Sequence, residues 1–205
     1  MSNRTPLLLV LALLLGCSAR QPQAERPRID LLAVLPIERK GTSSDGDEGK
    51  VLPEDAGVAV TAQVYRFLAS RPDFRFVADL ALQDVVQGPS VRGAADLESR
   101  AVALGKEVSA DAVIFGTVSR FRERVGTEFG VTSPAAVSFD LGVVDVASGE
   151  VLWQGRFDKT QEPLSSNLFN FWMFWRAGPH WFSARELAGL GVDKLLREMT
   201  DRVGP

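Results

Sequence analysis

The sequence is poor in the side chains that build disulfides and metal centres. Its 205 residues include one cysteine and one histidine, so an internal disulfide is excluded and zinc sites built from several such ligands are disfavoured. Neither sign of charge is in large excess, because 23 Lys and Arg balance 26 Asp and Glu and leave a net charge of -3. A nucleic-acid-binding chain usually carries a marked basic excess. We therefore expect no metal, no cofactor and no nucleic-acid partner.

No apolar run is long enough for a permanent membrane span. The run from Leu7 to Leu15 is nine residues long, whereas a transmembrane helix needs roughly 20. This run follows Arg4 and precedes Gly16 and Cys17, which is the layout of a signal peptide. The amino terminus is thus predicted to direct export.

The only cysteine ends a short lipoprotein motif. Leu14-Leu15-Gly16-Cys17 resembles the bacterial lipobox, in which small residues precede a cysteine that takes a diacylglycerol. The resemblance implies a signal peptide over residues 1–16 and an acylated Cys17 inserted in the lipid bilayer, where two or more acyl chains hold a protein stably. In similar lipoproteins Asp after the cysteine favours the inner membrane; Ser18 here predicts the outer membrane, facing the periplasm. The alternative is a free thiol beside an ordinary secretory cleavage site.

The residues after the cysteine predict a short tether and one domain. Residues 17–28 comprise the cysteine and the polar, Pro-containing stretch SARQPQAERPR, which has no hydrophobic period. Its eleven residues reach about 36 Å at most, so the domain is expected to lie close to the membrane. We expect residues 29–205 to form a single periplasmic domain.

Hydrophobic periodicity predicts an α/β fold. We expect a mixed sheet, with parallel strands early and an antiparallel three-stranded meander late, packed by about four helices. Two signals are specific: the continuous apolar run LLAVLPI is typical of an interior strand, and Ser183 with Glu186 has the spacing of a helix capping box. The expected elements, in order, are a strand at Leu31–Ile37, a helix at Asp55–Ser70, a strand at Phe74–Val77, helices at Asp79–Gln87 and Ala95–Val108, strands at Asp111–Arg124, Ala136–Val146 and Glu150–Phe157, and a helix from Ser183 to near Val203.

An aromatic segment interrupts the expected connection between the last strand and the last helix. Residues 168–182, LFNFWMFWRAGPHWF, hold three of the four Trp and four of the 12 Phe. Three interpretations stay open: burial in the core, a recognition surface for a partner, and insertion among lipid headgroups. For the last two, the expected contact residues are Trp172, Trp175, Arg176 and Trp181.

No catalytic constellation is evident, so we expect a protein that is not an enzyme. His180 with Ser165 or Ser166 lacks a nucleophile-elbow motif. Glu123 and Asp140 could form the pair of carboxylates that glycoside hydrolysis uses. Glu123 has Arg on both sides, however, which favours an ion-paired surface. Asp45 to Ala56 fits a calcium loop poorly, and Gly189-Leu190-Gly191 favours close helix packing over a phosphate loop.

Three runs carry a family likeness. LLAVLPIE at 31–38, ADAVIFGTV at 110–118 and VVDVASGEVLW at 143–153 resemble the curli-assembly lipoprotein superfamily, which is related in fold to the lipoprotein activators of penicillin-binding proteins and to the amino-terminal domain of the Tol-Pal translocation protein. The resemblance implies a non-catalytic module that binds another envelope protein. A self-associating subunit of an envelope assembly or secretion complex is the alternative, and a small hydrolase is a remote one.

Two departures from this superfamily narrow the expected function. The connection from Val125 to Ala135 is too short for two membrane-spanning strands of about 9 to 11 residues each, which disfavours a pore. The activators of penicillin-binding proteins have a long tether that crosses the cell wall, and the tether here is too short for that.

Overall fold

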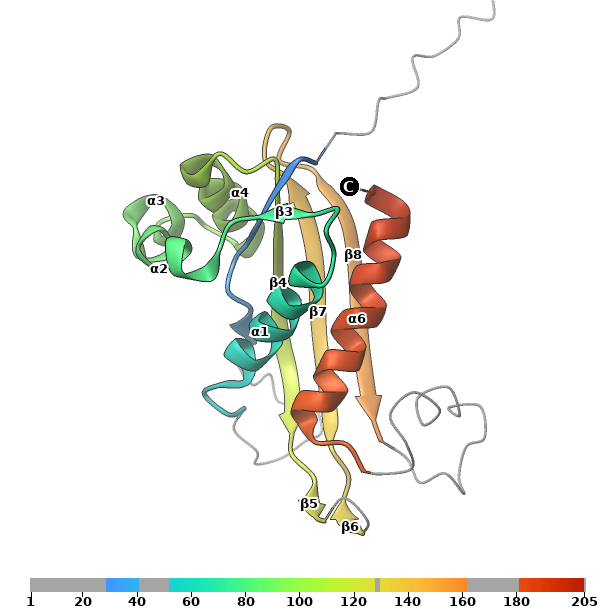
Figure 1. Cartoon of the computed structure of the whole chain (residues 1–205). Helices are drawn as coiled ribbons and strands as arrows, with labels where there is room; N and C mark the ends of the chain where they lie inside the picture. The colour runs from blue at the N-terminus through green and yellow to red at the C-terminus, as the bar shows by residue number, and fades with distance from the viewer. Residues whose placement is uncertain (1–28, 41–51, 128–129, 162–180, 205) are drawn as a thin grey trace, which may run out of the picture.

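A six-stranded mixed sheet forms the centre of the molecule (Figure 1). The computed structural model describes residues 29–40, 52–127, 130–161 and 181–204. The strand order is β3-β1-β4-β7-β8, with β2 pairing with β4 beyond β1. Pairings among β1, β2, β3 and β4 are parallel, and β4, β7 and β8 form an antiparallel meander, which confirms the predicted mixed sheet. The strands are β1 Leu31–Val34, β2 Glu38–Arg39, β3 Arg75–Phe76, β4 Ala112–Arg122, β7 Ala136–Asp145 and β8 Val151–Thr160.

Helices cover both faces of the sheet (Figure 1). Helices α1 (Ala56–Ala69) and α6 (Ala184–Val203) pack on one face, while α2 (Asp79–Gln87), α3 (Pro89–Arg92) and α4 (Leu97–Val108) lie on the other. Helix α2 has the predicted bounds. The short α3 is additional: Gly88 is extended and ends α2, as expected, but Pro89 then starts a new helix because its fixed φ suits the first helical position.

The two apolar layers explain the continuous apolar run in β1. Leu32 and Val34 point to the layer beneath α1 and α6, whereas Ala33 and Leu35 point to the layer beneath α2 and α4. All four are at most 1% exposed. Strand β1 lies between β3 and β4, as an apolar run without alternation predicts.

The first strand ends earlier than predicted. Strand β1 stops at Val34 rather than at Ile37, and pairing with β4 resumes only at Glu38. Pro36 lies in this gap, where its ring holds φ at about −65° rather than the value of about −120° typical of a parallel strand. The N–H of Ile37 instead donates to Oγ1 of Thr61 on α1 at 2.9 Å. This hydrogen bond connects the residues after β1 to α1.

Strand β3 (Arg75–Phe76) is shorter than predicted and α4 begins at Leu97 rather than Ala95, and further differences lie in the meander. A β-bulge at Ser119 shifts the register of β4 against β7, from Val118 opposite Phe139 to Arg120 opposite Ser138. Strand β8 continues to Thr160 rather than Phe157, because its pairing with β7 extends to Ala136. The connection between β4 and β7 also holds a small second sheet, β5 (Val125–Gly126) with β6 (Val131–Ser133).

Helix α6 approaches the sheet through a glycine. A Cβ on Gly191 would lie 2.6 Å from the ring of Phe157, a residue of β8 that is 4% exposed. A Cβ on Gly189 would meet only the amide end of Gln63 on α1, at 2.9 Å. The predicted packing role of Gly189-Leu190-Gly191 is therefore confirmed, and Gly191 carries most of it.

Replacing each glycine with alanine tests this difference. Both changes gain the same helix propensity, about 1 kcal/mol, but only Gly191→Ala forces a buried ring to move. We expect Gly191→Ala to have a free energy of unfolding about 1–3 kcal/mol below that of Gly189→Ala, measured by urea titration. Equal stabilities of the two variants would contradict the packing role.

Candidate functional site

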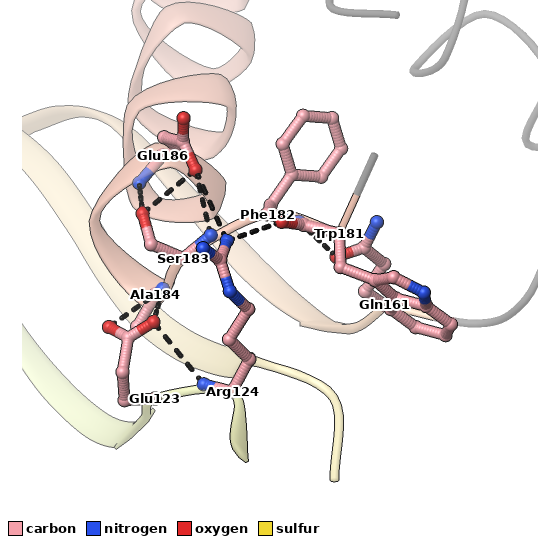
Figure 2. Close-up of polar contacts among 8 residues, drawn as sticks. All are labelled: Glu123, Arg124, Gln161, Trp181, Phe182, Ser183, Ala184 and Glu186. Carbon is pink, nitrogen blue, oxygen red and sulfur yellow. Dashed lines mark hydrogen bonds and ion pairs between the residues drawn. The ribbon is translucent and has the colours of Figure 1, made fainter. Parts of the chain in front are cut away.

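The start of helix α6 is held by a reciprocal cap (Figure 2). Oγ of Ser183 accepts the N–H of Glu186 at 3.2 Å, and the Glu186 carboxylate accepts the N–H of Ser183 at 2.8 Å. This is the capping box predicted from the spacing of the two residues. It fixes where α6 begins and therefore the position of the chain that enters it.

A second acid comes from the end of β4. The carboxylate of Glu123 accepts the N–H of Ala184 through both oxygens, at 3.0 and 3.1 Å (Figure 2). The N–H groups of a first helical turn have no partner in the helix and carry partial positive charge, so carboxylates stabilise them. Two carboxylates, from residues 63 positions apart in the sequence, thus converge on the same turn.

The neighbouring arginine links this cap to the aromatic segment. The guanidinium of Arg124 donates to the backbone carbonyl of Trp181 and lies 3.9 Å from the Glu186 carboxylate. Arg124 therefore holds the last residues of the segment against the end of β4. The prediction that the charges around Glu123 form ion pairs holds for Arg124, while Glu123 itself acts as a cap.

The residues that border positions 162–180 are bonded to each other. The N–H of Phe182 donates to the side-chain oxygen of Gln161 at 2.7 Å (Figure 2), and the N–H of Gln161 donates to Ala135 at 3.0 Å. Gln161 is 3% exposed and Phe182 is 1% exposed. Both ends of the intervening segment are therefore fixed in the folded core.

Only one of the four predicted contact residues, Trp181, lies among the described residues. Trp181 is half-buried and sits beside the cap, while Phe182 packs in the core beneath α1 and α6. Trp172, Trp175 and Arg176 lie outside the described residues, as do Cys17, the tether and the signal peptide. The contact role of these residues, Trp181 included, stays a prediction.

The described residues do not assemble a catalytic or metal centre. Asp140 lies opposite Thr117, so Glu123, beyond the end of β4, is roughly 20 Å farther along that strand. Asp140 instead pairs with Arg156 at 3.8 Å. In the described ranges no three acidic, His or Cys side chains gather around a metal position. His180, Ser165, Ser166 and the acidic loop at 45–48 lie outside those ranges.

Two further groups are poor candidates for chemistry. Burial, followed by the charge of Asp79, raises the pKa of the Tyr65 hydroxyl well above its ordinary value, so this phenol stays protonated. An open hollow of about 470 Å³ lies beside β2 and the start of α4. Of the charged residues that line it, Glu38 and Arg100 are paired with each other, and Asp96 caps α4 through the N–H of Ser99. None of the described helices is both long and apolar enough to cross a membrane.

Removing the acid on β4 tests whether it supports α6. We expect Glu123→Ala to lower the free energy of unfolding by about 0.5–2 kcal/mol, as for other lost N-terminal caps. The matched control is Glu107→Ala, an exposed acid in the last turn of α4, which should leave stability unchanged or slightly raised. Equal free energies of unfolding for the two variants in denaturant titrations would contradict the capping role.

Comparison with known proteins places the fold in a family context. Residues 58–158 match the family described as the peptidoglycan-synthase activator LpoB; this range runs from α1 into β8. No curated protein matches the chain in sequence.

Several solved structures are similar at low identity. The PelC dodecamer from Paraburkholderia phytofirmans is 16% identical, with a TM-score of 0.48 and coverage of 82% of this chain and 86% of that one. Lipoprotein GNA1162 from Neisseria meningitidis is 15% identical, with a TM-score of 0.48 and coverage of 84% and 99%. The LpoB C-terminal domain from Escherichia coli is 18% identical, with a TM-score of 0.42 and coverage of 64% and 83%. The family match from α1 into β8 confirms that this chain resembles the superfamily of bacterial lipoproteins that includes the peptidoglycan-synthase activators.

Proposed function

We propose that this protein is a non-catalytic lipoprotein of the bacterial envelope that binds a partner protein in the periplasm. The observation that carries the proposal is the match of residues 58–158 to a family of synthase activators, proteins that act on an enzyme. The lack of a catalytic constellation among the described residues is compatible with such a role.

The proposed anchor is acylated Cys17, in the outer membrane and facing the periplasm. The described fold begins at Ile29, so about eleven residues, spanning at most about 36 Å, separate it from the lipid. Confinement of this kind raises the effective concentration of the domain toward a partner near the same membrane, so a modest interface suffices.

Replacing the cysteine tests the anchor. We expect Cys17→Ala to abolish acylation and to leave the protein soluble in the periplasm or unprocessed, because a single unmodified side chain provides no membrane affinity. Fractionation of cells and mass measurement of the amino-terminal peptide give the result. A normally processed, membrane-bound Cys17→Ala product would refute the lipoprotein assignment.

A peptidoglycan synthase is the first partner to examine, because the matched family is named for activating one. The short tether adds a geometric condition: the contacting part of the synthase must come within reach of the anchored domain. We propose that the aromatic segment supplies contacts, through Trp172, Trp175, Arg176 and Trp181. Phe182, the last residue of the segment, is held by Gln161, which supports this role because a surface with an end already fixed loses less conformational entropy on binding.

Photo-crosslinking in living cells tests the binding role. With a photoreactive residue at Trp172 or Trp175 of the full-length protein, we expect a discrete heavier protein band that contains a peptidoglycan synthase by mass spectrometry. The control is the same residue at Arg66, an exposed position on α1. Lipid adducts would instead assign the segment to the membrane, and absence of any adduct with impaired folding would assign it to the core.

Self-association is the second candidate, and one observation favours it. Strand β8 is the last strand in the sheet order, so among the described residues its outer edge has no strand partner, and such an edge is a ready template for pairing. A ring or larger oligomer of the purified protein in light scattering would favour this candidate, whereas a partner-binding module should be monomeric alone.

A further inference from the structure

One half of a sheet face is polar rather than covered by helices in the described structure. On the side of α2 and α4, apolar contacts reach Phe115 on β4 and Val144 on β7. Farther along the strands, toward β5 and β6 (Figure 1), the register places polar side chains on that same side. We name this surface the open sheet face; its members are Arg120, Arg122, Ser138, Asp140, Arg156 and Asp158.

The bulge at Ser119 creates this surface. Before the bulge, Val118 faces the layer of α1 and α6; after it, Phe121 faces that layer and Arg120 and Arg122 face the other side. If β4 ran as a regular strand through Ser119, alternation from Val118 would point both arginines into the apolar core. The bulge therefore places two guanidinium groups on the open sheet face.

Most charges on the open sheet face are paired across strands. Arg120, Ser138 and Asp158 occupy one row of β4, β7 and β8, and Arg120 forms an ion pair with Asp158 above Ser138. Arg156 lies 3.8 Å from Asp140 and 3.9 Å from Asp158. These pairs arrange positive and negative charge in a fixed pattern.

Arg122 is the exception. It occupies the next row, opposite Ala136, which in turn is opposite Thr160. Its Nε is buried without a hydrogen-bond partner, and it takes part in no ion pair in the described part of the chain. The Oγ of Ser138, 2% exposed, is likewise buried without a partner. A partly desolvated, unpaired charge destabilises a fold, so folding alone does not explain this arginine.

We propose that the open sheet face is the docking surface for a partner protein and that Arg122 binds a carboxylate of that partner. This inference rests on the proposed function, whose partner it describes chemically. A guanidinium matches a carboxylate with two parallel hydrogen bonds, and the mixed charges of this face can complement those of a protein surface. The acids Asp140 and Asp158 on the same face disfavour an anionic membrane, which presents charge of one sign only.

The test uses photo-crosslinking at Thr160, an exposed residue in the row of Arg122, in the full-length protein in cells. We expect a protein adduct whose crosslinked peptide contains Asp or Glu. Arg122→Glu should reduce the adduct at least about tenfold, and Arg122→Lys should reduce it less because one charge remains. Arg66→Glu, the same change on α1 behind the opposite face, should leave the adduct unchanged.

Thermal unfolding of each purified variant separates lost binding from lost folding, and Arg122→Gln replaces Arg122→Glu if the latter is unfolded. An adduct unaffected by Arg122→Glu, a lipid adduct, an adduct to a second copy of the chain, or no adduct at Thr160 would overturn the proposal. Protein adducts at Trp172 with none at Thr160 would reject this surface and leave the proposed function standing. Absence of protein adducts at all these positions would reject the function as well.

Discussion

The pairing of β4 with β7 is the interaction on which the rest of the structure depends. Strand β4 also pairs with β1 and β2, so it joins the parallel half of the sheet to the antiparallel meander. Its bulge at Ser119 decides which side chains beyond that point face each layer. The end of the same strand delivers Glu123 and Arg124 to the start of α6. A single register thus determines the core, the open sheet face and the cap together.

Local patterns in the sequence were sufficient to predict most helices and strands. The apolar run of β1, the bounds of α2 and the capping box at Ser183 depend on neighbouring residues, and each was predicted. The early end of β1 falls just before Pro36, whose fixed φ does not suit a parallel strand, although the apolar run itself continues to Ile37. Helix α3 was missed because Gly88 and Pro89 mark a break equally well whether or not a new turn follows.

The candidate site was predictable only where its contacts join residues that are close together in the sequence. Glu123 caps a residue 61 positions away, and Gln161 binds Phe182 across 21 positions; no periodicity carries such information. The bulge is similar, since nothing in the sequence around Ser119 marks it, and register against a partner strand is a property of the assembled sheet. The open sheet face and the unpaired Arg122 therefore emerge only from the structure.

The hydrogen bond between Gln161 and Phe182 also bears on how the protein can change over evolutionary time. It joins the residue after β8 to the residues that lead into α6, so these two elements are held together by a contact between described residues. The entropic cost of closing a loop rises only with the logarithm of its length, about 0.6 kcal/mol for each doubling. A change in the number of residues between these two positions therefore costs little through chain entropy alone, so relatives of this protein are expected to differ in length here more readily than within β8 or α6.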